Sequence, residues 1–162
     1  MEKTSRRNML SKAAKAAAVV TAGAALVEGA KAQAQPRLEK RNPLAPPPQP
    51  GQPVQRQMYS GAVAYGNMLF LSGVGYHQPD TIEVHTRKVV EELEQTLIKA
   101  GSSLQKVLKV NVYLNDLKDY DRMNAVYRSF DWGTVPPVRT TVAPAAGIPG
   151  NSLIEIDLIA YI

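Results

Sequence analysis

Residues 107–114 read VLKVNVYL, and from Leu108 onwards apolar and polar side chains alternate strictly. Successive side chains of an extended chain point to opposite faces of a sheet. The apolar members are Leu108, Val110, Val112 and Leu114, and the polar ones are Lys109, Asn111 and Tyr113. The alternation predicts a strand that buries one face and leaves the other open.

On the amino-terminal side of this strand the pattern predicts a hairpin and a helix. Residues 57–65 and 68–72 are strand-like and are joined by the turn pair Gly66-Asn67. Asp80 is placed to cap the following helix, with Glu83 as its reciprocal partner, and Gly101 is placed to end it. The broad apolar face of the helix contains Val84, Val89, Val90, Leu93, Leu97 and Ile98.

On the carboxyl-terminal side a second helix and two strands follow. Asp119 is a candidate cap, and residues 131–133 are expected to end the helix. Its apolar residues at helical spacing are Tyr120, Met123, Tyr127 and Phe130. After a strand around Arg139 and a loop rich in proline and glycine, residues 153–161 alternate again. The order ββαβαββ predicts an α+β sheet with both helices on one face.

The open face of the last strand contains Glu155, Asp157, Ile159 and Tyr161, a mixture of charged and apolar side chains. A purely solvated face would be polar throughout, so this mixture favours an oligomer that covers it.

The stretch VPPVRTTVAP, residues 135–144, looks like a buried strand with one arginine, Arg139, at its centre. Burying an unpaired charge costs several kcal/mol. Arg139 therefore reaches solvent, pairs with a carboxylate of the protein, as in a salt bridge at a subunit interface with Glu155 or Asp157, or binds the carboxylate of a ligand.

Composition excludes several classes of site. The chain has no cysteine, which removes disulfides, thiol nucleophiles and cysteine-based zinc sites. Its two histidines, His77 and His85, are too few for a histidine-built metal site, so no metal is expected. The net charge of +5 comes mostly from residues 1–34, which hold six of the 19 basic and two of the 14 acidic residues. The remaining 13 basic and 12 acidic residues leave a nearly neutral body, which argues against nucleic-acid binding.

Residues 1–34 have the organisation of a signal peptide. Arg6-Arg7 precede an alanine-rich apolar run over 16–26, and Ala32-Gln33-Ala34 forms the small-x-small pattern of a cleavage site. The apolar run is too short to span a bilayer, and the arginine pair is typical of a twin-arginine signal. We expect cleavage after Ala34, export to the periplasm and no membrane span in the mature protein. A basic amphipathic helix or a disordered tail is the alternative interpretation.

Residues 35–55 are expected to form a linker or arm. Seven of the twelve prolines lie in 35–53. Proline lacks the N–H that a strand ladder needs, so we expect an extended spacer with no hydrogen-bonded ladder, or else a docking ligand.

Three blocks in residues 56–162 resemble the Rid family, the reactive intermediate deaminases of RidA or YjgF type. They read MYSGAVAYGNMLFLSG, LIKAGSSLQKVLKVNVYLNDLKDYDRMNAVYRSF and PPVRTTVAPA with LIEIDLIAYI, in that order. The resemblance implies a chorismate-mutase-like fold and a homotrimer with pockets at its subunit interfaces. It also implies hydrolysis of small 2-enamino or 2-imino acids to 2-keto acids and ammonia, without a metal or organic cofactor.

The same resemblance implies roles for five residues. Arg139 matches the arginine that binds the substrate carboxylate, and a planar guanidinium suits that group because it forms two parallel N–H bonds. Glu155 matches a glutamate that positions water or carries a proton. Tyr59, Asn124 and Thr141 match residues that line the pocket, although the family often has cysteine at the position of Thr141.

Other features of the chain leave the function open. The loop after Gly73 is shorter than in the best-characterised deaminases and the 143–152 loop slightly longer, so the substrate range is expected to differ, with Tyr76 or His77 filling part of the space. One alternative function is a non-catalytic trimeric module that binds a small carboxylate or a protein. RNA cleavage is a further alternative, which the neutral body disfavours.

Overall fold

The computed structural model describes residues 38–47, 49–51 and 57–162. The predicted signal peptide lies outside these residues, and so do parts of the predicted arm. No helix within the described ranges has the length and apolar character that a bilayer span requires.

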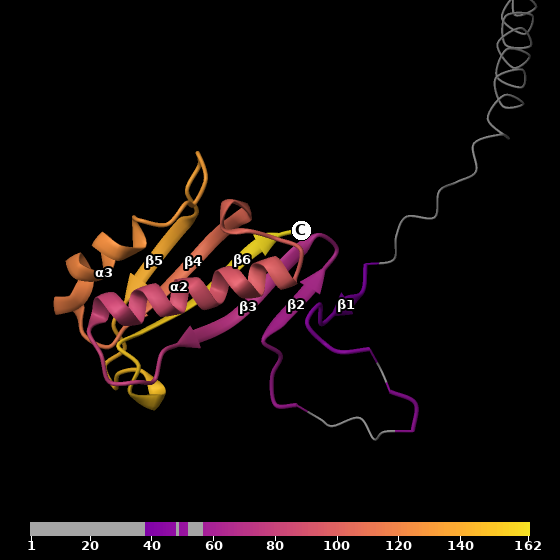
Figure 1. The fold of residues 1–162 in the computed structure, drawn as a ribbon, viewed down its shortest axis with the longest axis horizontal. Helices are drawn as coiled ribbons and strands as arrows, with labels where there is room; N and C mark the ends of the chain where they lie inside the picture. The colour runs from indigo at the N-terminus through magenta and orange to yellow at the C-terminus, as the bar shows by residue number, and fades with distance from the viewer. Residues whose placement is uncertain (1–37, 48, 52–56) are drawn as a thin grey trace, which may run out of the picture. The chain divides into compact units, whose positions relative to one another are not determined.

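A six-stranded sheet forms the centre of the described chain (Figure 1). Its strands are β1 (Lys40–Arg41), β2 (Ala62–Tyr65), β3 (Met68–Gly75), β4 (Val107–Leu114), β5 (Val138–Val142) and β6 (Ile154–Tyr161). They lie in the order β1-β2-β3-β6-β4-β5. All neighbouring pairs are antiparallel except β4 and β5, which run parallel.

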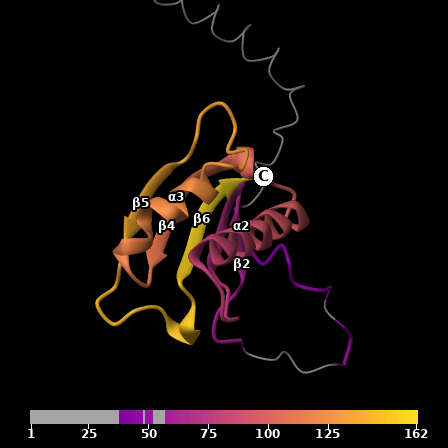
Figure 2. The same cartoon turned by 60° about the vertical axis from the view of Figure 1, so that its left-hand side comes forward.

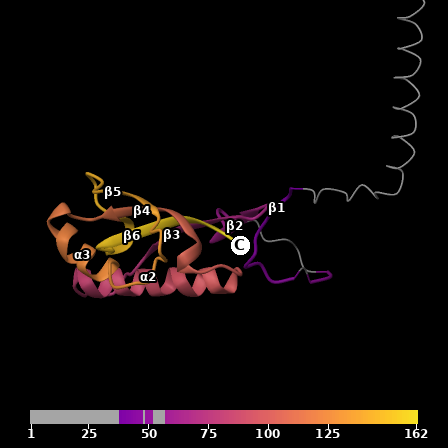
Figure 3. The same ribbon diagram turned by 90° about the horizontal axis from the view of Figure 1, so that it is seen from above.

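The two helices, α2 (Ile82–Lys99) and α3 (Tyr120–Tyr127), cover one face of this sheet, as the view from above shows (Figure 3). Short 3-10 turns, η1 (Leu104–Lys106), η2 (Leu117–Asp119) and η3 (Pro149–Asn151), lie in the connections. The predicted α+β order ββαβαββ is therefore confirmed, with β1 added at its start.

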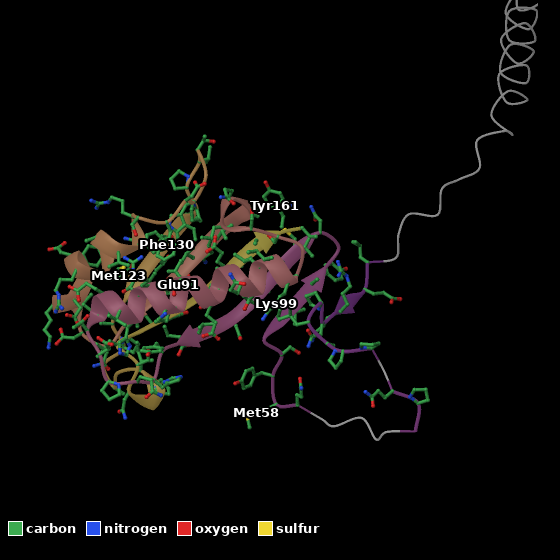
Figure 4. The ribbon with its side chains drawn as sticks, viewed as in Figure 1. Met58, Glu91, Lys99, Met123, Phe130 and Tyr161 are labelled. Atoms are coloured by element: carbon green, nitrogen blue, oxygen red, sulfur yellow. The ribbon has the colours of Figure 1, made fainter. Side chains whose placement is uncertain are left out.

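Alternation along the central strands builds the core against the helices. In β6 every second side chain is buried, and these are Ile154, Ile156, Leu158 and Ala160. Leu93 and Leu97 of α2 and Met123 of α3 are fully buried on the same side. Sticks in Figure 4 mark Met123 on α3.

The predicted helix ends were right at Gly101 and wrong at Asp80. The α2 helix ends in a Schellman arrangement, because Ser102 N–H donates to Leu97 O at 2.8 Å and Gly101, at φ +84°, donates to Ile98 O. At its start the cap is Thr81, whose hydroxyl accepts from Val84 N–H, while Asp80 accepts from the Thr81 N–H. The helix cap therefore lies one residue later than predicted.

Two residues predicted to lie on apolar faces are exposed. Ile98 of α2 is 55% exposed, although the preceding Leu97 is fully buried. Leu108 of β4 is 45% exposed because a bulge between Val107 and Lys109 shifts the register against β6. Val107 takes the buried position that the alternation assigned to Leu108.

The second helix is also shorter than predicted. It ends at Tyr127, before residues 131–133, and Asp119 precedes it without a capping hydrogen bond from its side chain. Tyr120 is 41% exposed, so the buried stripe consists of Met123, Val126 and Tyr127.

The expectation that the proline-rich segment forms no ladder is wrong for Lys40 and Arg41. These two residues pair with Tyr65 and Ala64 of β2. By contrast, the predicted strand over 57–65 begins only at Ala62; Met58, 97% exposed, projects from the loop before it (Figure 4).

An ion pair joins the two helices. Arg122 of α3 donates from Nε and Nη2 to the two carboxylate oxygens of Glu83 of α2, each at 2.7 Å. This bidentate bond lowers the pKa of Glu83 from 4.5 to about 2. Because the folded pKa lies below the unfolded one, the stabilisation is complete above pH 4.5 and is lost as the pH falls towards 2.

Replacing Glu83 by Gln should therefore lower the Tm at about pH 6, and the difference from the wild type should shrink as the pH approaches 2. The pair is exposed to solvent, so about 1 M salt should also reduce the difference at about pH 6. Thermal unfolding followed by circular dichroism measures both. A Tm difference that is constant with pH would show that the carboxylate charge is not involved.

Candidate functional site

Arg139 points to the helix-covered face of the sheet from an edge strand. The strand β5 has only β4 as a neighbour, and Arg139 pairs with Val110 and Thr141 with Val112. Paired residues of adjacent strands project to the same face, and Val110 and Val112 face the helices. The prediction that this strand is buried is wrong for the single chain, since Val138 and Val142 on its other face are 69% and 45% exposed.

The guanidinium of Arg139 is held by two side chains of α3. Its Nη2 donates to Asn124 Oδ1 at 2.7 Å, and its Cζ lies 4.7 Å from the centre of the Tyr127 ring. Tyr127 also stacks on Trp132, with ring centres 4.5 Å apart and planes inclined by 17°. A cation over an aromatic face is attracted by the ring quadrupole, so the guanidinium is oriented without being neutralised.

Two hydroxyl groups near Arg139 lack partners. Within the described chain, the buried Tyr127 hydroxyl and Thr141 Oγ1 form no hydrogen bond. Burial raises the pKa of Tyr127 to about 12, although the charge of Arg139 opposes the shift, so the phenol keeps its proton at neutral pH. We call Asn124, Tyr127, Arg139 and Thr141 the arginine surface; Arg139, Asn124 and Tyr127 line a pocket of about 400 Å³.

Glu155 lies on the opposite face of the same sheet. It pairs with Tyr113 of β4 and Gly75 of β3, between the buried residues Ile154 and Ile156. Its carboxylate occupies the space beside Gly73, where a Cβ would lie only 2.8 Å from Glu155 Cδ. A bulge between Leu71 and Val74 creates this close approach.

Asp157, two residues further along β6, is already engaged on that face. It accepts from Asn111 Nδ2 at 2.8 Å and from the Tyr113 hydroxyl at 2.9 Å. The hydrogen bond to Asp157 raises the pKa of Tyr113. Neither Asp157 nor Glu155 pairs with Arg139 in the described chain, so the predicted salt bridge with either residue could form only between protomers.

Tyr59 and Glu155 each lie beside Gly73 but line different pockets, and the pocket of Glu155 measures about 170 Å³. Tyr59 is 74% exposed and lines, with Gly73 and Ser72, a pocket of about 470 Å³ beside the free edge of β3. The short β2 covers only the first half of β3, which leaves this edge open. We call Tyr59, Gly73 and Glu155 the glutamate surface.

The five predicted site residues thus divide into two groups. Arg139, Asn124 and Thr141 share the arginine surface, and Tyr59 and Glu155 belong to the glutamate surface. The sheet separates the two groups in one protomer, so a single chain does not bring all five together.

Two residues of these surfaces were missed from sequence. Tyr127 was assigned only to the apolar side of its helix, although its spacing of three from Asn124 places both on one helical face. Gly73 gave no local signal, because its role depends on a side chain 82 positions away in sequence. Among the described residues, no group of three or more His, Cys, Asp or Glu side chains is arranged to hold a metal ion.

Residues 51–162 match the family model described as endoribonuclease L-PSP. The chain belongs to this family. The match covers both surfaces and every strand except β1. The resemblance of residues 56–162 to Rid proteins is confirmed by relatives that are named for the same group.

A RutC family protein of Pyrococcus horikoshii is 40% identical over 110 residues, which cover 64% of this chain and 86% of the relative. The crystal structure of a YjgF family member from Neisseria meningitidis aligns with a TM-score of 0.60 at 29% identity, covering 66% of this chain and 89% of the other. A Rid family protein from Yersinia pestis aligns with a TM-score of 0.62 at 26% identity, over 68% and 92% of the two chains.

Replacing Gly73 by Ala should destabilise the protein by about 1–3 kcal/mol, because the new methyl group overlaps the Glu155 carboxylate. In the Glu155→Ala background the same change should be nearly neutral, since the overlapping group is gone. Urea unfolding of the four proteins measures this coupling. Gly61→Ala is the matched control, because a Cβ there meets nothing within 4 Å.

Equal destabilisation by Gly73→Ala in both backgrounds would place the conflict elsewhere in the bulge, and Glu155 would then not be held against Gly73.

Proposed function

We propose that the protein is a trimeric hydrolase of small 2-imino or 2-enamino acids, which it converts to 2-keto acids and ammonia. The observation that carries this proposal is the Arg139 guanidinium, which lines a pocket and has no carboxylate partner among the described residues. No metal or organic cofactor takes part in the proposed reaction.

Arg139 suits a small carboxylate in both charge and geometry. A guanidinium has five N–H donors, and Asn124 accepts from only one nitrogen. The remaining donors can form the paired bonds that fix a carboxylate in position and in plane. The partly covered position of Arg139 strengthens these bonds, because fewer water molecules compete for the charge.

Catalysis in this proposal needs both surfaces, and they come from neighbouring protomers. Arg139 and Glu155 lie on opposite faces of one sheet. A pocket that contains both therefore forms where the arginine surface of one protomer meets the glutamate surface of the next. The homotrimer that the resemblance to Rid proteins implies would provide such interfaces.

Within this pocket each remaining residue has a chemical task. Glu155 holds the water that attacks the imine carbon, and Tyr59 donates a hydrogen bond to the substrate or to the water. Thr141 contributes a hydroxyl group without a partner among the described residues, on the same face of the sheet as Arg139. The Asn124 carbonyl keeps the guanidinium oriented. These roles follow from the chemistry of an imine, whose carbon must be attacked by water and whose nitrogen must receive a proton.

Arg139→Ala in the mature protein, residues 35–162, should lower kcat/KM for 2-iminopropionate generated in situ by at least about 100-fold, because a pair of charge-assisted bonds is worth about 3 kcal/mol or more. Arg139→Lys should recover only part of the loss, since a lysine keeps the positive charge but lacks the two parallel N–H donors of a guanidinium. Imine decay is followed in a coupled assay, and size-exclusion chromatography checks that the trimer persists.

Equal decay with wild type and Arg139→Ala would end the deaminase proposal for this substrate. Tight binding of a 2-keto acid without any turnover would favour the alternative, a carboxylate-binding module. RNA cleavage, suggested by the family description, is tested with single-stranded RNA in the same series; the nearly neutral body makes us expect no cleavage.

Mixed trimers test whether the pocket is shared. When Arg139→Ala and Glu155→Ala chains carrying different tags are co-expressed, roughly one interface in three of each mixed trimer combines an intact Arg139 with an intact Glu155. We expect mixed trimers purified through both tags to recover about a third of wild-type activity, while each variant alone is inactive. Mixed trimers that are as inactive as the parents would place both residues in the pocket of a single protomer.

We also propose that the protein is exported through a twin-arginine signal in residues 1–34 and works in the periplasm. Replacing Arg6-Arg7 by Lys-Lys should then block export and leave unprocessed precursor in the cytoplasm, because the arginine pair is the recognised element. Fractionation and mass determination of the amino terminus measure this. Continued export of the variant would indicate the general secretory route.

A further inference from the structure

His77 lies in the loop between β3 and α2 and lines the pocket beside the free edge of β3. It lines the cavity of about 470 Å³ together with Tyr59 and Gly73. Gly75, whose backbone pairs with Glu155, leaves room for the ring, because a Cβ at Gly75 would lie 3.4 Å from His77 Cε1. The imidazole therefore faces a cavity that shares Gly73 with the glutamate surface, while Glu155 itself lines a smaller hollow of about 170 Å³.

A backbone carbonyl fixes the protonation pattern of this ring. His77 Nδ1 lies 2.9 Å from Gly150 O, and a carbonyl oxygen can only accept. Nδ1 therefore carries the hydrogen, and in the neutral ring Nε2 has the free lone pair. Oriented in this way, the ring can take a proton at Nε2 and return it.

The fold makes room for the ring in a manner that a surface histidine does not require. Gly150 has φ +72°, and a Cβ there would lie 2.7 Å from His77 Nδ1; a Cβ at Gly75 would lie 3.4 Å from Cε1. Ser152 Oγ accepts from the Tyr76 N–H at 3.0 Å, which joins the two loops. Figure 2 shows these loops at the same end of the sheet, so the position of the ring is determined by tertiary structure.

The second histidine has no such freedom. His85 is 1% exposed, and both of its ring nitrogens are used: Nδ1 accepts from Leu153 N–H at 3.2 Å and Nε2 donates to Gln78 O at 3.0 Å. Among the described residues, His77 is thus the imidazole with a nitrogen available to a ligand.

We propose that His77 is a catalytic residue of the imine hydrolysis, the group that moves the proton between water and nitrogen; this inference rests on the proposed function. Nε2 takes a proton from the water as its oxygen bonds to the carbon of the protonated imine, and the C=N π pair moves to nitrogen. The resulting imidazolium then protonates the amine. The C–N bond breaks as the hydroxyl oxygen forms C=O, and the hydroxyl proton leaves with the ammonia as ammonium.

The dependence of activity on pH can also reflect the titratable side chains around His77. The other titratable side chains that line the pocket are Tyr59 and Glu92 of α2, and Glu155 lies beyond Gly73. In this assignment the activity falls on the acid side when Nε2 becomes protonated before the reaction. Glu155 keeps the task of holding the water.

The test replaces His77 by Gln in the full mature trimer and follows 2-iminopropionate decay as a function of pH. We expect kcat to fall about 100-fold or more and the acid limb due to the imidazole to disappear. Binding of pyruvate, measured by calorimetry, should be unchanged, because Arg139 is intact. Unchanged kcat with an unchanged acid limb would overturn the role of His77.

Displacing the ring without removing it gives a second measurement. Gly150→Ala should lower kcat because its methyl group pushes His77 aside. Gly51→Ala is the matched control, since Gly51 has a similar φ of +83° but meets nothing within 4 Å, so it should leave kcat unchanged. Equal kcat in the two variants would show that the position of the His77 ring does not affect catalysis and would count against the proposal.

Arg139→Ala is measured in the same series to separate the two proposals. If Arg139→Ala is inactive while His77→Gln keeps full activity, only the His77 role fails. If the wild type does not accelerate imine decay, the proposed function fails and the His77 role fails with it.

Discussion

The parallel pairing of β5 with β4 is the constraint on which the functional interpretation depends. Side chains of paired strands share a face, so the Val110–Arg139 register sends the guanidinium to the face covered by α3. A shift of one residue would send Arg139 to the other face, towards the side of Glu155, and would leave Asn124 without its partner. With the observed register, one chain presents the arginine surface and the glutamate surface on opposite faces of the sheet, so the proposed pocket requires a neighbouring protomer.

The arginine surface shows how a protein can hold a charge ready for a ligand. An acidic partner would neutralise the guanidinium, whereas Asn124 and the Tyr127 ring orient it and leave the charge in place. The cost of keeping this cation partly buried is moderated by the ring and the amide. The two unpartnered hydroxyls beside it, on Tyr127 and Thr141, are groups that a polar ligand or a neighbouring chain would satisfy.

On the glutamate side, the missing side chains of glycines create the arrangement. Gly73 allows Glu155 to lie against β3, and Gly75 and Gly150 allow the His77 ring to lie between two loops. Each close approach joins segments that are far apart in sequence, 73 to 155 and 77 to 150. The bulge in β3 and the positive φ of Gly150 are the backbone features that accompany them.

Local periodicity was sufficient to predict the element order, the extent of β4 and the alternation of β6, because the repeats of strands and helices are properties of consecutive residues. It was also sufficient for the Gly101 cap, since the Schellman arrangement involves only neighbouring residues. The residue types of the site, above all Arg139 and Glu155, were recognisable from the blocks that surround them. Each of these features depends only on a short stretch of consecutive residues.

Tertiary structure alone decided which face each of these residues occupies. The bulge that exposes Leu108, the pairing of Lys40 and Arg41 with β2, and the edge position of β5 all depend on contacts between distant strands. The separation of Arg139 from Glu155 by the sheet has the same origin. Register is set by the joint packing of all strands, and no short stretch of sequence contains that information.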